Sequence, residues 1–281
     1  AGRGVKHAMR LALQEADLFH FGYPPSMRRM YQEGGSELVK AFQQAKSSGV
    51  TTSLDFCMPD PNSESGQVDW RMVLEKVLPF TDIFTPSLDE LLFMIDRPMY
   101  AQSKSGGSIR SFLESQPHLL KSLGSQLLGL GAGVVLIKLG EYGAYLRTGT
   151  MERIARLGRA APPDPALWSN RELWAPCFQV QVVGTTGSGD ATIAGFLCAL
   201  LRGFTPERAL TLAVAAGASN VEAADALSGI PGWDQLLGRV QAGWERLILF
   251  QHLPGWSWNP EQQLWRSGRD TRVIARKENE I

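Results

Sequence analysis

The chain has 281 residues, and its 28 Lys and Arg side chains balance 28 Asp and Glu side chains, so the formal net charge is zero. That length allows one large α/β domain or two small ones. The charge balance gives no electrostatic reason to expect nucleic acid or an acidic membrane as a partner. No apolar run approaches the roughly 20 residues that span a bilayer. The first residues also lack the apolar stretch of a signal peptide, so we expect a cytoplasmic protein.

Short apolar runs alternate with amphipathic stretches along the whole chain. The predicted strands cover residues 17–22, 50–56, 82–86, 132–140, 143–149 and 177–183. The predicted helices cover residues 6–16, 36–49, 69–80, 87–95, 108–116, 118–131, 189–203, 206–224 and 233–248. The proline-rich stretch 159–176 is predicted to be a loop.

This alternation predicts right-handed βαβ units, and hence a Rossmann-like three-layer α/β/α fold with a mostly parallel central sheet. We expect one domain over residues 1–250, followed by a C-terminal tail over residues 251–281. The chain begins at Ala1 without a methionine, and the helical pattern starts almost at once. We therefore expect further sequence upstream.

The cysteines and histidines give no sign of a metal site. Cys57, Cys177 and Cys198 lie far apart and form no C-x-x-C motif, which indicates free thiols in a reducing compartment. The four histidines form no H-x-x-x-H pair, which argues against zinc.

The stretch "VVGTTGSGDATIAGFL", residues 182–197, places a glycine-rich turn between a predicted strand and a predicted helix. Ligands of open α/β sheets bind at the carboxyl ends of the strands. Glycines let the backbone approach a ligand closely, and the free amides of a helix start favour an anion such as phosphate. The turn is neither a Walker A sequence nor G-x-G-x-x-G.

Asp190 adds a carboxylate to the first turn of that helix. A carboxylate there can accept a proton from a hydroxyl while the amides of Gly187, Ser188 and Gly189 hold charge on a transferred group. Phosphoryl transfer to an alcohol needs that combination of a base and an anion hole. The alternative is that Asp190 only caps the helix and the glycines only make a tight turn.

The segment "GTTGSGDATIAGFL" resembles the second signature of the ribokinase-like (phosphofructokinase B type) sugar kinases, D-T-x-G-A-G-D. Ser188 replaces the usual alanine, and Gly184 replaces the first aspartate. In relatives that aspartate helps to hold a monovalent cation, so its loss argues against activation by potassium. The positions that match are Thr185, Thr186, Gly187, Gly189 and Asp190.

Four further segments resemble the family in the family's order. They are "ADLFHFG" at residues 16–22, "VTTSLDFCMPDPN" at 50–62, "IFTPSLDELLFM" at 83–94 and "VVLIKLGEYGAYL" at 134–146. The second resembles a strand that ends in Asp-Pro-Asn, and both Asp55 and Asp60 fit its aspartate. In relatives, further strands, a small β-sheet lid and an aspartate that grips the sugar precede the first segment. The resemblance therefore implies that the N-terminal strands and the lid are absent here.

The resemblance also implies roles for single residues. Glu90 matches a glutamate that organises Mg²⁺ through water, although Ser87 replaces the asparagine of that motif; the alternative is an exposed helix carboxylate. Lys138, Gly140 and Thr186 match nucleotide-binding positions, while Lys138 also reads as an ordinary strand-end lysine. Gly143 is expected to serve a turn. The small residues that either admit adenine or form a packing face are Ala213, Ala215, Ala216 and Gly217.

The resemblance implies ATP-dependent phosphoryl transfer to a hydroxyl of a sugar or sugar-like molecule, with ATP and Mg²⁺ as cofactors. The departures at Ser87 and Gly184 leave open a nucleotide-binding pseudokinase without turnover. A Rossmann-type dehydrogenase is disfavoured, because no strand is followed by G-x-G-x-x-G and an acidic residue about 20 positions later. The sequence identifies neither the sugar nor the oligomeric state.

Overall fold

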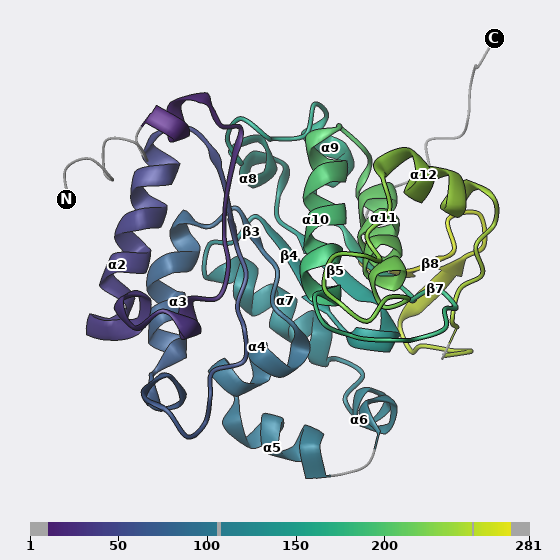
Figure 1. The fold of residues 1–281 in the computed structure, drawn as a ribbon, viewed down its shortest axis with the longest axis horizontal. Helices are drawn as coiled ribbons and strands as arrows, with labels where there is room; N and C mark the ends of the chain where they lie inside the picture. Colours follow the sequence, from purple (N-terminus) through teal and green to yellow (C-terminus); the bar gives the residue numbers. More distant parts are fainter. Residues whose placement is uncertain (1–10, 106–107, 249, 271–281) are drawn as a thin grey trace.

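The computed structural model describes residues 11–105, 108–248 and 250–270. An eight-stranded sheet crosses the molecule in the order β1-β2-β3-β4-β5-β6-β8-β7, with helices on both of its faces (Figure 1). The strands are β1 Leu18–Phe21, β2 Thr51–Leu54, β3 Ile83–Phe84, β4 Val134–Lys138, β5 Ala144–Thr148, β6 Glu172–Ala175, β7 Trp256–Asn259 and β8 Leu264–Ser267.

Strands β1 to β4 are parallel neighbours. From β4 onward each neighbour pairs antiparallel, through β5, β6, β8 and β7. All strands except β5 and β8 consequently point in one direction. The predicted mostly parallel sheet is confirmed in that sense, and its second half is an antiparallel extension.

The sheet separates two hydrophobic cores, as the alternation of side chains along a strand requires. In β4, Val135 and Ile137 belong to the core covered by α2, α3, α4, α6 and α7, whereas Val134 and Leu136 belong to the core covered by α8 to α12. This arrangement is the predicted three-layer α/β/α fold. The helices are α2 Arg28–Ser47, α3 Trp70–Val77, α4 Leu88–Ile95, α5 Arg97–Ser105, α6 Ile109–Ser115, α7 Leu119–Gly129, α8 Met151–Ala155, α9 Pro165–Trp168, α10 Ser188–Leu201, α11 Pro206–Asn220 and α12 Trp233–Gln241.

The structure corrects two predicted segments between β5 and α10. The stretch 159–176 is not all loop, because it contains α9 and β6. Proline is tolerated in the first turn of a helix, and Pro165 starts α9 behind the capping side chain of Asp164. The stretch 177–183 is not a strand: it forms a single bridge, from Phe178 to Arg246. Several of its residues are exposed.

Several predicted helices differ in extent from the observed ones; the helix predicted over residues 36–49, for example, corresponds to α2, which begins at Arg28. Helix α11 ends at Asn220. Helix α12 ends at Gln241, and Gly243 follows it with a positive φ of 86°, a conformation typical of helix C-termini. Of the helix predicted over residues 6–16, residues 11–15 are helical, and residues 6–10 lie outside the described part. None of the helices in the described ranges has the length and apolar character needed to cross a bilayer.

The parallel half of the sheet determines where a site can form. Strands β1, β2, β3 and β4 all end at the same edge, and β6 ends there too because it runs in the same direction. The residues that follow these strand ends therefore lie next to each other. The helices α4 and α10 begin at that edge.

Candidate active site

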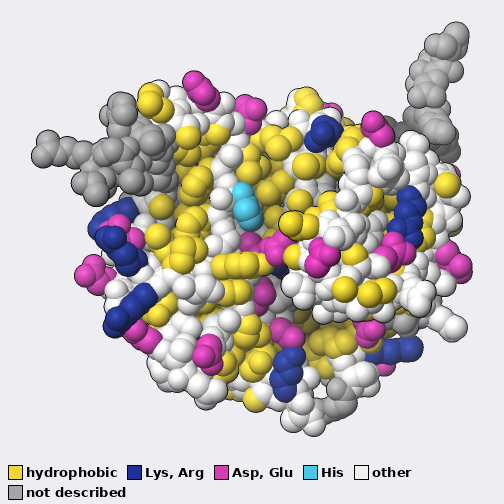
Figure 2. All heavy atoms as spheres, in the orientation of Figure 1, with side chains coloured by type: hydrophobic (Ala, Val, Ile, Leu, Met, Phe, Trp, Pro, Cys, Tyr) yellow, Lys and Arg dark blue, Asp and Glu magenta, His cyan; other side chains and the backbone are white. Residues whose placement is uncertain are grey.

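A cleft of about 730 Å³ lies at the carboxyl edge of the sheet. Its lining comes from the ends of β1, β2 and β4, the start of α4, the glycine-rich turn and the second half of α11. Hydrophobic side chains cover much of the face seen in Figure 2, and several acidic side chains lie near its middle. Most of the residues expected from the sequence to form a site line this one cleft.

The glycine-rich turn leads directly into α10. Gly187 precedes the helix in a left-handed conformation with φ of 78°, and a Cβ atom there would lie 2.8 Å from Ala226. Glycine is therefore required at this position. Among the described residues, nothing accepts a hydrogen bond from the amides of Gly189 and Asp190, whereas the Ser188 amide donates to the carbonyl of Thr185 at 3.3 Å. Two amides at the positive end of a 14-residue helix thus remain available to an anion.

Tyr23 lies directly against Asp190, and the sequence did not indicate this contact. The Tyr23 hydroxyl donates to both carboxylate oxygens, at 2.6 Å to Oδ1 and 2.7 Å to Oδ2. Burial and the neighbouring Asp190 carboxylate raise the pKa of Tyr23. The residue follows the end of β1 in a left-handed conformation with φ of 62°, which is uncommon for a residue other than glycine. Its position after a strand end was the one available signal.

Lys138 and Asp55 form a buried ion pair on the floor of the cleft. Lys138 Nζ lies 2.8 Å from Asp55 Oδ1, and burial raises the pKa of Asp55 to about 7. A Cβ atom on Gly189 would lie 3.5 Å from Lys138 Nζ, so the ammonium group lies beside the glycine turn. Asp60, the other candidate for this position, is exposed and accepts a hydrogen bond from the Asn62 amide at 2.9 Å. The structure therefore brings Asp55, not Asp60, into the cleft.

Glu90 is half-buried in the same cleft rather than exposed on its helix. Its carboxylate accepts a hydrogen bond from the Ser87 amide at 2.7 Å, and the Ser87 side chain accepts one from the Glu90 amide at 3.3 Å. This reciprocal capping box starts α4. Burial raises the pKa of Glu90. The backbone amide of Ser87 thus orients the Glu90 carboxylate, while the serine side chain caps the helix.

The carboxylates of Glu90 and Asp55 offer the hard oxygen donors that Mg²⁺ prefers. No group of three His, Cys, Asp or Glu side chains in the described ranges could hold a metal ion. Magnesium usually keeps several waters and binds through one or two carboxylates together with substrate phosphates, so a complete protein cage is not required. The residues present fit an ion that is held jointly with a nucleotide.

The remaining predicted residues divide between the cleft and its surroundings. Gly140 lines the cleft and has a positive φ of 58°. Gly143 serves the turn into β5, where a Cβ atom would meet the Ala175 carbonyl oxygen at 1.9 Å. Thr186 is exposed and does not line the cleft, whereas its neighbour Thr185 does.

The small residues of α11 divide between a close helix contact and the wall of the cleft. A Cβ atom on Gly195 of α10 would lie 2.8 Å from Ala216 and 3.1 Å from Ala213, so these alanines form a close helix contact. Gly217 also packs against α10, because a Cβ atom there would lie 2.2 Å from Thr192 Oγ1. With Val214 and Ala218 it forms the apolar stripe of α11 that lines the cleft. Together with Val182 and Val221 this stripe supplies the apolar part of the cleft.

Known proteins resemble this chain in sequence and in fold. A profile of the pfkB family of carbohydrate kinases matches residues 4–232. The 2-dehydro-3-deoxygluconokinase of Bacillus subtilis is 30% identical over 112 residues, which are 40% of this chain and 29% of that enzyme.

Two solved structures share the fold at low sequence identity. A ribokinase from Thermotoga maritima has a TM-score of 0.51 at 21% identity, covering 83% of this chain and 59% of its own. A fructokinase from Xylella fastidiosa with bound ATP has a TM-score of 0.55 at 18% identity, covering 83% and 63%. The chain thus spans less than two thirds of the length of each of these proteins.

Proposed function

The chain belongs to the pfkB family of carbohydrate kinases, and from that premise we propose that it transfers a phosphoryl group from ATP to a hydroxyl of a sugar or sugar-like molecule, with Asp190 as the general base. The contact between Tyr23 and Asp190 carries the proposal. Both carboxylate oxygens of Asp190 lie within 2.7 Å of a hydroxyl oxygen at the mouth of the anion-binding turn. A group that accepts a hydrogen bond from one hydroxyl can accept the proton of another in the same place.

In this proposal each group of residues has a separate role in phosphoryl transfer. Asp190 takes the proton of the acceptor hydroxyl, and the amides of the turn from Gly187 to Asp190 stabilise charge on the transferred group. Lys138, beside the turn, adds a positive charge at the same point. The apolar stripe with Val182 and Val214 suits the flat face of a nucleobase.

Glu90, with Asp55 close by, would hold Mg²⁺ through water. The ion, when bound, neutralises phosphate charge. Gly184, in place of the family's aspartate, argues against a requirement for potassium. We also propose that the molecule works in the cytoplasm and needs no nucleic-acid or membrane partner.

The variant Asp190→Asn tests the general base. Asparagine keeps the size of the side chain and cannot accept the proton, so the rate of phosphoryl transfer should fall by about 10²–10⁴-fold. Binding of ATP–Mg²⁺, measured by calorimetry, should stay close to that of the parent chain. The rate is measured with a panel of sugars and sugar acids, and Asp60→Asn is the matched control on an exposed carboxylate.

The same experiment separates the proposal from the pseudokinase alternative. A pseudokinase binds ATP and transfers no phosphoryl group to any acceptor, with or without Asp190. Unchanged transfer in Asp190→Asn would show that another group is the base. Absence of ATP binding in the parent chain would show that the glycine turn has only a structural role.

A further inference from the structure

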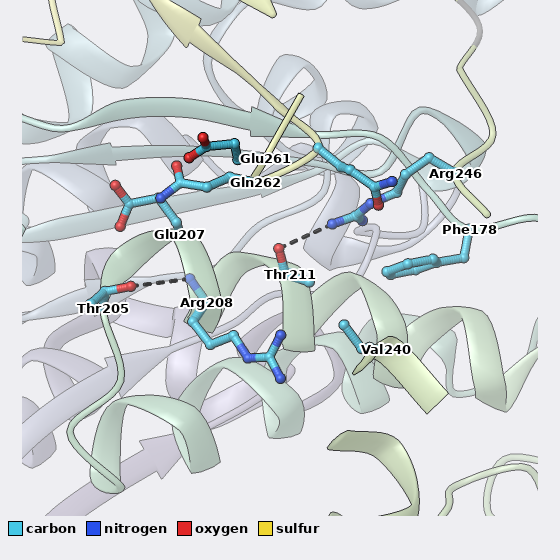
Figure 3. A pocket seen from close by; sticks show the side chains of 10 residues that line it. Phe178, Thr205, Glu207, Arg208, Thr211, Val240, Arg246, Glu261 and Gln262 are labelled. Atoms are coloured by element: carbon cyan, nitrogen blue, oxygen red, sulfur yellow. Dashed lines mark hydrogen bonds between the residues drawn. The ribbon is translucent and has the colours of Figure 1, made fainter. Parts of the chain in front are cut away.

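A second pocket, of about 330 Å³, lies at the opposite end of α11 from the cleft. It is bordered by the first turns of α11, by α12 and by the turn between β7 and β8. Thr211 lies between Arg208 and Arg246 on its wall (Figure 3). Phe178 lines both this pocket and the cleft, and none of the residues assigned to phosphoryl transfer lines it.

Arg246 is a buried cation without a carboxylate partner in the described part of the chain. The residue is only 5% exposed. Its guanidinium group donates to the Pro176 carbonyl at 2.8 Å and to Thr211 Oγ1 at 3.0 Å, and it lies 3.9 Å from the centre of the Phe178 ring. Its Nε has no hydrogen-bond partner there. Burial lowers the pKa of Arg246 to about 9.

A second buried arginine in the described part of the chain, Arg171, has carboxylate partners. Arg171 pairs with Glu207 at 2.6 Å and with Asp270 at 2.8 Å. A buried charge is costly unless it is paired, so a buried guanidinium that contacts only neutral groups needs an explanation. A ligand that supplies the missing negative charge would give one.

Arg208 adds a second positive charge to the same pocket. It is half-buried, burial lowers its pKa, and it makes no ion pair within the described ranges. Because Arg208 and Thr211 are three residues apart on α11, they share one face of the helix. The hydroxyl that Arg246 contacts is thus one helical turn from a second guanidinium group.

The acidic residues of the pocket do not cancel these two charges. Glu207 is engaged by Arg171 at 2.6 Å and by Arg266 at 3.2 Å, so its charge is already compensated. Glu261 is exposed at the border of the pocket. The inner wall therefore has an excess of positive charge, with Thr205 and Gln262 as further polar groups.

We propose that this pocket is a binding site for a small oxyanion ligand, a phosphate or carboxylate group held between Arg208 and Arg246. The volume of about 330 Å³ accommodates a small metabolite. Planar guanidinium groups are well suited to both anions, because each can be bound through two parallel hydrogen bonds. The site is independent of the phosphoryl-transfer proposal, because it shares none of the residues that the proposal uses.

Thermal unfolding of the whole chain tests the site. The chain is titrated with inorganic phosphate, and separately with succinate, at an ionic strength matched with sodium chloride. At least one of the two anions should raise the unfolding temperature above the chloride baseline, because a ligand that binds only the folded state stabilises it. Phosphate and succinate identify which oxyanion the pocket prefers.

Variants of Arg208 locate the effect. Arg208→Gln removes one charged contact and should weaken binding about tenfold, and Arg208→Glu should abolish the gain. Neither variant breaks an ion pair of the described structure, so both are expected to fold. Arg29→Gln, on the exposed surface of α2, is the matched loss of one charge and should bind as the parent does.

Two outcomes would overturn the proposal. One is no gain over chloride with either anion. The other is an equal gain in the parent and in Arg208→Glu, which would place the anion elsewhere, for example at the glycine turn of α10.

Discussion

The ion pair between Lys138 and Asp55 makes the stability of the cleft depend on pH. Burial raises the pKa of Asp55 to about 7, above its value of about 3.9 in an unfolded chain. The folded state therefore holds the Asp55 proton more tightly than the unfolded chain does. The contribution of Asp55 to the free energy of unfolding declines as the pH rises from about 4 to about 7. Lys138 offsets this decline by pairing with the ionised carboxylate.

We predict that Lys138→Met destabilises the protein more at pH 8 than at pH 5. At pH 8 the variant leaves a buried carboxylate without its partner, at a cost of about 3 kcal/mol. At pH 5 Asp55 is mostly protonated, so the loss is small. Urea unfolding at both values measures the difference, and Lys40→Met, which removes an exposed lysine, should show little dependence on pH. An equal loss of stability at pH 5 and at pH 8 would contradict the raised pKa of Asp55.

At the scale of elements, the contact between α10 and α11 fixes the wall of the cleft. A Cβ atom on Gly195 would come within 2.8 Å of both Ala216 Cβ and the Leu212 carbonyl oxygen. Alanine normally stabilises a helix interior by about 1 kcal/mol relative to glycine. Here the two helices must move apart, so Gly195→Ala should lower the free energy of unfolding by about 1–3 kcal/mol.

Gly238 in α12 provides the matched control, because nothing lies within 4 Å of a Cβ atom placed there. Gly238→Ala should therefore stabilise the protein by up to about 1 kcal/mol. Denaturant unfolding of both variants measures whether each change raises or lowers the free energy of unfolding. Stabilisation of the same size at both positions would show that α10 and α11 are not tightly packed.

At the scale of the whole molecule, the last two strands continue the sheet instead of forming a separate layer. Strand β8 pairs with β6 and places Leu264 in one core and Trp265 in the other. A chain that ends at residue 250 should lose at least about 3 kcal/mol of stability from these two side chains alone. Circular dichroism during heating measures the change. An unaltered unfolding temperature would support the predicted division into residues 1–250 and a separate tail.

The sequence predicted what local pattern determines, and it missed what distant pairing determines. Alternating apolar runs identified β1 to β5, and the glycines before Asp190 identified the helix start at the cleft. Strand β6 lies within the proline-rich stretch 159–176, and its pairing with β5 and β8 leaves no local signal. Polar and apolar residues alternate over 177–183 as in a strand, yet the stretch forms only one bridge with the segment beside it, from Phe178 to Arg246.

The two missed residues with most bearing on function have the same explanation. Tyr23 meets a residue 167 positions later in the chain, and Arg246 meets Thr211 on another element. Neither contact has a spacing that periodicity can reveal. Asp55 was one of two candidates until the strand ends were placed in space, because both aspartates follow the same strand.

The hydrogen bonds of Tyr23 have a consequence for how an acceptor would enter. Both carboxylate oxygens of Asp190 accept a hydrogen bond from the Tyr23 hydroxyl. If Asp190 is the base, the hydroxyl of an incoming sugar has to replace the Tyr23 hydroxyl at the Asp190 carboxylate. Part of the binding energy of the sugar is then used to displace Tyr23. A water molecule would also have to displace Tyr23 from Asp190, and it lacks the binding energy that a sugar supplies. On the same premise, the contact with Tyr23 would protect bound ATP from hydrolysis by water until a sugar displaces Tyr23.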